Sequence, residues 1–259
     1  MKRSRSITSK LRRPSKRAAL KLRAFYDALF ASYGAQQWWP AQTPFEVVIG
    51  AYLTQNTSWR GVAQSIDRLR ERGLLTAAGL RDVSEEELRS VIRPSGYMVR
   101  KAAALKAFVG WLDAGYGGDL ARLAAETMPV ARGKLLALPG VGPETADAIL
   151  LYALGQPAMV VDEYLRRVVT RHRLVRDGAL YDEIAELARM SFAGDEDASR
   201  LQHYNEFHAL IVEVGKRHCG TRPRCGGCPL AGFQPRPRNL AAAQGRARAT
   251  LTGRSTPSA

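Results

Sequence analysis

Apolar residues recur along this chain at the three- and four-residue spacing that places them on one face of a helix. In the segment that begins at Pro44, one such face holds Phe45, Val48, Ile49, Tyr52 and Leu53. Similar segments cover 59–72, 84–93, 98–114 and 118–126. No stretch shows the two-residue alternation that is typical of half-buried strands. The pattern therefore predicts an all-α protein of short helices, whose core forms by packing helix against helix.

A sharp turn joins two later helices. Residues 132–137 read as helical, the sequence LPGVG at 138–142 turns, and Pro143 opens the next helix. Glycines permit positive φ in such a turn, and the backbone N–H groups beside them suit a phosphate. We predict a DNA-binding helix–hairpin–helix over 132–153, with a plain connecting turn as the alternative. The predicted phosphate contacts are Leu138, Gly140, Val141, Gly142 and Thr145.

Asp162 stands at the start of a basic helix predicted for 163–172. It can serve there as an N-cap, because aspartate is a favoured capping residue. It can also be a carboxylate held at the mouth of a DNA cleft, and capping would fix its side chain for that purpose. The residues by themselves leave both roles open.

The formal net charge of the 259-residue chain is +15, and all of the excess lies in its two ends. Residues 1–24 hold ten basic side chains and no acid, and residues 235–259 hold five arginines and no acid. We expect disordered tails at 1–16 and 235–259, which either attract polyanions such as DNA or only solubilise the chain. No apolar run approaches the roughly 20 residues of a membrane span, and the basic N-terminus lacks the apolar stretch of a secretory signal.

Three cysteines, Cys219, Cys225 and Cys228, lie within ten residues of one another. A disulfide framework needs an even number of cysteines spread along the chain. The spacing instead favours a metal cluster in a reducing compartment, with one ligand missing. We therefore expect a cytoplasmic protein, and the predicted DNA-binding hairpin adds the expectation that it is nucleoid-associated.

Several segments together resemble the endonuclease III superfamily of DNA glycosylases, over roughly residues 25–230. The resemblance rests on LPGVGPETADAILLYALGQPAMVVDEYLRRV from Leu138, on FEVVIGAYLTQNT at 45–57, and on HALIVEVGKRHC at 208–219 followed by RCGGCPL. WWP at 38–40 and IRPSGYMVRKA at 92–102 are similar to the third-class bacterial 3-methyladenine DNA glycosylases.

This resemblance implies two helical domains with a DNA cleft between them. The implied barrel domain spans 37–150, and the second domain combines a helix at 17–36 with residues 151–234, including the cysteine loop at 219–228. Double-stranded DNA with a damaged base is the implied partner, without a membrane, and the implied state is a monomer.

Asp162 matches the catalytic aspartate of the family. In members that also cleave the strand, a lysine stands two residues after the second hairpin glycine, where this chain has Glu144. A carboxylate cannot form a Schiff base, and Lys134 is a poor substitute. The resemblance implies a monofunctional glycosylase that hydrolytically removes an alkylated purine such as 3-methyladenine. The alternatives are a damaged-pyrimidine glycosylase with lyase activity and a non-catalytic DNA-binding relative.

The resemblance also implies a pocket for a flipped-out base, lined by Trp38, Trp39 and Trp59. Aromatic faces hold a cationic base by stacking and cation–π attraction. Ordinary core packing of these tryptophans is the alternative. Gln55 and Asn56 are expected to wedge into the gap that the base leaves.

Family members bind a four-iron cluster through Cys-x6-Cys-x2-Cys-x5-Cys. This chain has Cys219-x5-Cys225-x2-Cys228, and the fourth position falls on Gln234. Three outcomes stay open: a [4Fe-4S] cluster with a ligand other than cysteine, a [3Fe-4S] cluster, or a loop without metal.

Overall fold

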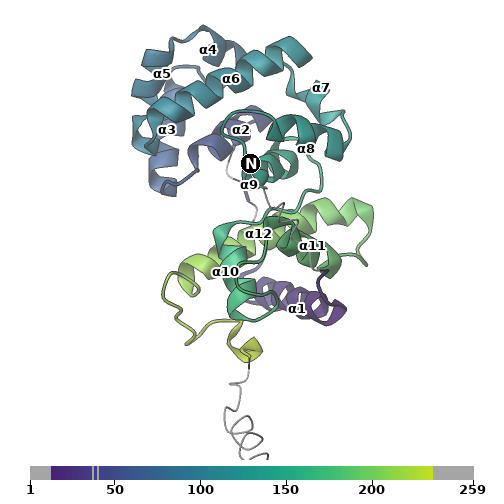
Figure 1. Cartoon of the computed structure of the whole chain (residues 1–259). Coiled ribbons are helices and arrows are strands. Elements are labelled where there is room, and N and C mark those ends of the chain that lie inside the picture. The colour runs from purple at the N-terminus through teal and green to yellow at the C-terminus, as the bar shows by residue number, and fades with distance from the viewer. Residues whose placement is uncertain (1–12, 37, 40, 236–259) are drawn as a thin grey trace, which may run out of the picture.

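The computed structural model describes residues 13–36, 38–39 and 41–235, and every regular element in these ranges is a helix (Figure 1). The all-α prediction is confirmed. None of the described helices is long and apolar enough to cross a membrane. Apart from residues 13–16 and Pro235, the two predicted tails lie outside the described ranges.

One group of helices surrounds a first hydrophobic core, in the upper half of Figure 1. It comprises α2 (Pro44–Leu53), α3 (Trp59–Glu71), α4 (Ala77–Asp82), α5 (Glu85–Val91), η1 (Arg93–Ser95), α6 (Met98–Tyr116), α7 (Leu120–Ala124), α8 (Met128–Leu136) and α9 (Pro143–Ala148). Every residue of α2 after Pro44 is buried, whereas the sequence predicts a single buried face. The acidic Glu46 is tolerated inside because Arg70 of α3 pairs with it at 2.6 Å.

A second hydrophobic core lies in the lower half of Figure 1. Its helices are α1 (Lys16–Tyr33), α10 (Glu163–Arg171), α11 (Tyr181–Ser191) and α12 (Asp197–Arg217). Phe25 of α1, Phe192 after α11 and Phe207 of α12 are fully buried there. The N-terminal helix therefore packs with elements that begin at least 130 residues after it ends.

Helices α10 and α12 approach each other closely at Gly215. A Cβ atom at this position would lie 2.1 Å from Cδ1 of Tyr164, far inside van der Waals contact. Only glycine lets the start of α10 lie against α12 in this way, and this contact brings Asp162 and α12 together.

The segment after the hairpin belongs to both cores. α9 continues into a π-helical turn, η2 (Ile149–Ala153), in which Leu150 packs into the first core and Leu151 into the second. Beside it, Asp147 accepts hydrogen bonds from Nε and Nη2 of Arg132 at 2.6 and 3.0 Å. Tyr181 of α11 donates to the same carboxylate at 2.8 Å, so this buried network joins the two groups of helices.

The structure extends the predicted helices in three places. α8 begins at Met128 rather than at 132, because Pro129 fits the first turn of a helix. The sequence pattern did not single out α4, which buries only Leu80, or α11. Short helices with few buried positions give weak periodicity, which explains the omission of α4.

Candidate functional site

A cleft of about 950 Å³ opens where the two groups of helices meet. Its walls come from the end of α2, the hairpin between α8 and α9, the residues before α10, and α12. Most of the residues predicted for the site line it, namely Trp38, Trp39, Gln55, Asn56, Trp59, Gly140, Gly142, Thr145 and Asp162. Leu138, Val141 and the three cysteines lie outside this lining.

Asp162 is at once a helix cap and a buried carboxylate of the cleft. Its Oδ1 accepts a hydrogen bond of 2.7 Å from the backbone N–H of Leu165, in the first turn of α10. Only 8% of the residue is exposed. The cap thus holds a negative charge in a fixed position at the wall of the cleft.

His208 of α12 lies beside this carboxylate, with its Nε2 atom 3.7 Å from Oδ2 of Asp162. The hydroxyl of Tyr152 lies 2.7 Å from Nδ1 of the same ring. Burial raises the pKa of Tyr152, and the negative charges of Asp162 and Glu206 raise it further, so the phenol keeps its proton. In the tautomer that carries its proton on Nε2, the Nδ1 atom accepts from the hydroxyl of Tyr152 and Nε2 faces the Asp162 carboxylate.

Three tryptophans form a cluster at the cleft. The ring centroids of Trp38 and Trp39 are 5.9 Å apart, and those of Trp59 lie 6.0 and 5.7 Å from them. Tyr152 extends the cluster, with its ring 5.3 Å from Trp39. Each tryptophan is half-buried, and the indole N–H of Trp38 finds no acceptor among the described residues. The cluster is therefore a partly open aromatic wall, although Trp59 also packs on the first core.

The hairpin leaves Gly140 and Gly142 exposed, and Gly140 has a φ of +77°. The side-chain amide of Gln55 donates to the carbonyl of Gly140 at 2.9 Å and to the hydroxyl of Thr145 at 3.0 Å. These bonds tie the end of α2 to the hairpin. Asn56 is exposed beside them, with a φ of +51°.

Glu144 lies in the first turn of α9 and lines the cleft. The residue borders solvent, yet the surrounding protein atoms desolvate its carboxyl group, and the negative charge of Asp162 adds to this. Together they raise the pKa of Glu144 to about 7. Near neutral pH the side chain is therefore partly protonated, and no amine stands where the strand-cleaving relatives carry one.

Lys134 lies outside the lining of the cleft. Its Nζ atom donates to Glu126 at 2.5 Å and to the hydroxyl of Tyr116 at 2.9 Å, and both hydrogen bonds raise the pKa of Lys134. A lysine attacks carbon only as the free amine, so this ion pair makes Lys134 unsuitable as a nucleophile.

Besides Tyr152 and His208, sequence reasoning missed Lys216 and Tyr181 as polar neighbours of the site. The ammonium of Lys216 lies 5.4 Å from the ring centroid of Trp38, and Tyr181 accepts a hydrogen bond of 3.2 Å from the backbone N–H of Val161, next to Asp162. Both line the cleft. They come from α12 and α11, and no sequence signal links these helices to Asp162 before they pack.

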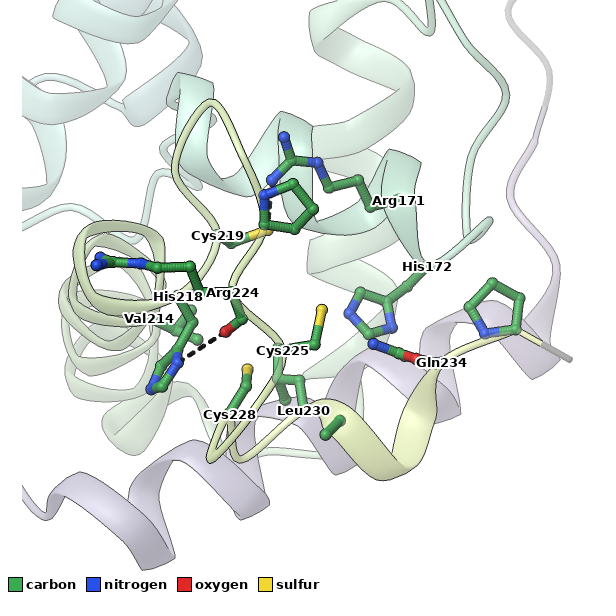
Figure 2. A pocket seen from close by; sticks show the side chains of 13 residues that line it. Arg171, His172, Val214, His218, Cys219, Arg224, Cys225, Cys228, Leu230 and Gln234 are labelled. Atoms are coloured by element: carbon green, nitrogen blue, oxygen red, sulfur yellow. Dashed lines mark hydrogen bonds between the residues drawn. The ribbon is translucent and has the colours of Figure 1, made fainter. Parts of the chain in front are cut away.

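The cysteine loop surrounds a second, smaller cavity of about 320 Å³ (Figure 2). All three cysteines line it, together with Gln234 and residues at the end of α10. Among the described residues, no three metal-binding side chains are close enough to hold a single ion. Thiols spread around a cavity suit a polynuclear iron–sulfur cluster better than one zinc ion, since a cluster separates its ligands.

Comparisons with known proteins agree with this architecture. Residues 49–192 match the family described as HhH-GPD superfamily base excision DNA repair protein. A Methanocaldococcus jannaschii protein named as a DNA repair glycosylase is 41% identical over 210 residues, which cover 80% of this chain and 93% of the relative. A thymine/uracil-DNA glycosylase of Pyrobaculum aerophilum is 29% identical over 219 residues, 80% of this chain and 88% of the relative.

A solved structure is similar along most of its length. It is the H. pylori 3-methyladenine DNA glycosylase bound to 1,N6-ethenoadenine, with a TM-score of 0.67 and 26% identity, and the match covers 77% of this chain and 97% of that one. The family match spans more than half of the chain, and it includes the hairpin, Asp162 and α11. The chain therefore belongs to the HhH-GPD superfamily of base excision DNA repair proteins and is a DNA glycosylase of that type.

Proposed function

We propose that this glycosylase is monofunctional and excises alkylated purines, such as 3-methyladenine, from double-stranded DNA. The observation that carries the proposal is a buried, capped carboxylate in a cleft that is walled by three tryptophans. The damaged base leaves the duplex to enter this cleft, because its glycosidic bond is out of reach inside the base stack.

Asp162 acts on the sugar in this proposal. Departure of the base breaks the bond between the base nitrogen and C1′, and positive charge develops on the sugar. A fixed carboxylate in a largely dry site stabilises that charge and takes a proton from the water that attacks C1′. A purine alkylated on a ring nitrogen leaves as a neutral base, so the reaction needs no proton donor for the leaving group.

The tryptophan cluster favours a cationic base. Such a base is attracted to the negative face of an indole ring, most strongly where water is excluded. The Lys216 ammonium already lies 5.4 Å from the centroid of Trp38, so the face of this ring accepts a cation. Asp162 and the partly ionised Glu144 add negative charge to the same cleft.

The hairpin binds the DNA backbone in this proposal. We propose that Gly140 and Gly142 present backbone N–H groups to a phosphate, because both residues are exposed at the rim of the cleft. Asn56, which is exposed beside them, is placed to enter the gap left by the base, while Gln55 holds the hairpin in position.

The decisive experiment is base release from double-stranded DNA that contains 3-methyladenine, with borohydride in a parallel reaction. We expect free 3-methyladenine, intact abasic strands and no trapped covalent complex. A trapped complex would contradict the monofunctional mechanism. In that case the Lys216→Ala variant tests which amine attacked the sugar, because Lys216 lines the cleft and Lys134 does not.

A damaged-pyrimidine glycosylase is the second candidate, and the match to the thymine/uracil-DNA glycosylase of Pyrobaculum aerophilum favours it. The same assay with uracil, thymine mismatched to guanine, and oxidised pyrimidines tests this candidate. Faster release of any of these bases than of 3-methyladenine would replace the alkylpurine assignment.

Truncation of the aromatic wall should weaken catalysis on cationic bases. We expect Trp39→Ala or Trp59→Ala to lower the rate of 3-methyladenine release by about 5- to 150-fold, since stacking of one base on one ring contributes roughly 1–3 kcal/mol. Trp111→Ala is the matched control, because this tryptophan packs against Phe108 and Tyr116 outside the cleft. Equal losses in all three variants would show that the pocket tryptophans act only through stability.

A further inference from the structure

The cysteine loop holds three thiols. Where the family pattern has its fourth cysteine, this chain has Gln234, whose amide is a hard and weak ligand for iron. The cavity that these thiols share is also lined by His172, the residue that ends α10. Figure 2 shows the imidazole ring of His172 beside Cys225, facing the space between the three sulfur atoms. The structure thus places an imidazole at the cavity of the three thiols, which lacks a fourth cysteine.

The His172 ring is held for metal binding in the way that ligand histidines usually are. Its Nδ1 atom lies 3.2 Å from the backbone carbonyl of Phe233, which leaves Nε2 for the cavity. The ring of Phe25 packs edge-on against it at a centroid distance of 4.8 Å. A hydrogen bond from one nitrogen to a carbonyl fixes the tautomer and the orientation of a metal-binding imidazole.

Arg171, the preceding residue, positions one of the thiols. Its guanidinium donates to Sγ of Cys219 at 3.2 Å and to the carbonyls of Gly220 and Thr221 at 2.8 Å each. These hydrogen bonds hold the start of the cysteine loop, including the Cys219 sulfur, against the end of α10.

We propose that His172 completes a cluster site of composition Cys3His, with Nε2 as the fourth ligand of a [4Fe-4S] cluster bound by Cys219, Cys225 and Cys228. His218 is the competing imidazole, but Figure 2 shows the ring nitrogen that is not bonded to Arg224 turned away from the sulfur atoms. The cluster takes no part in base release. It fastens the C-terminal end of α10, whose N-terminal cap is Asp162.

The test uses the full chain, produced with iron and sulfide supply and purified without oxygen. Iron, sulfide and zinc are measured per chain, together with the visible spectrum and the EPR signal. We expect about four iron and four sulfide for the wild type, with no EPR signal in the oxidised form. In His172→Ala we expect about three iron and the EPR signal of an oxidised three-iron cluster, because one corner loses its protein ligand.

Three variants make the result specific. His218→Ala and Gln234→Ala should keep the wild-type iron content and spectrum, and His172→Cys should restore the four-iron cluster that His172→Ala loses. The restoration also excludes misfolding as the cause, since Cys cannot replace the packing of the ring against Phe25. A four-iron cluster in His172→Ala with an unchanged spectrum, zinc in place of iron, or a wild type without metal would each overturn the proposal. Base release is measured separately, so failure here is distinct from failure of the proposed glycosylase activity.

Discussion

Asp162→Asn should lower the single-turnover rate of 3-methyladenine release by about 10²- to 10³-fold, the usual effect of removing one preorganised electrostatic group from an active site. The variant removes the charge that stabilises the sugar cation. It keeps the helix cap, because asparagine caps as well as aspartate and Leu165 still finds an acceptor. The dissociation constant for DNA with an abasic-site analogue should stay within about threefold of the wild type. The reason is that the Asp162 charge acts on the sugar cation of the transition state and not on the bound DNA.

Asp119→Asn is the matched control for this experiment. Asp119 caps α7 through a hydrogen bond of 2.8 Å to the backbone N–H of Ala121, and it lies outside the lining of the cleft. Its substitution changes a capping aspartate in the same chemical way and should leave base release unaltered. Release by Asp162→Asn at a rate close to that of Asp119→Asn would show that the Asp162 charge is not used in the reaction.

Asp147→Ala should destabilise the fold by about 3–5 kcal/mol, because it leaves the Arg132 guanidinium without its buried partner. Asp147 is 4% exposed and receives two hydrogen bonds from Arg132 and one from Tyr181. The hydrogen bond to Asp147 is the largest influence that raises the pKa of Arg132, in line with a strong contact. Denaturation in urea should show a lower midpoint with an unchanged slope.

Asp113→Ala provides the comparison for this prediction. Asp113 also receives a bidentate pair of hydrogen bonds from an arginine, at 2.7 and 2.5 Å from Arg81, but this pair lies at the surface. Surface ion pairs contribute little to stability, so the midpoint should hardly move. Similar midpoints for the two variants would mean that Asp147 does not join the two groups of helices in the way that its contacts indicate.

The local features of this protein are readable from its sequence. The apolar spacing predicts α2, α3 and α6 to within a few residues, and Pro143 marks the start of α9. Such features depend on contacts between residues close in the chain, through helical periodicity, capping and the conformational freedom of glycine. The resemblance to the endonuclease III superfamily was needed to match Glu144 to the lyase position, two residues after the second hairpin glycine.

Tertiary packing decided which of these residues meet. Tyr152 reaches His208 across 56 residues of sequence, and Gln55 reaches Thr145 across 90. The sequence holds no signal for the approach of His208 to Asp162, which depends on α10 and α12 packing at Gly215.

The sequence by itself determined most of the helices, the hairpin, the position of Asp162 at the start of α10, and the spacing of the three cysteines. Only the tertiary structure gathered the tryptophans into one wall, buried the Asp162 carboxylate beside His208, and brought His172 to the cysteine loop. The physical reason is the separation along the chain over which each kind of interaction acts. Helix formation and capping act over a few residues, whereas burial and contact between distant side chains exist only after two hydrophobic cores have formed.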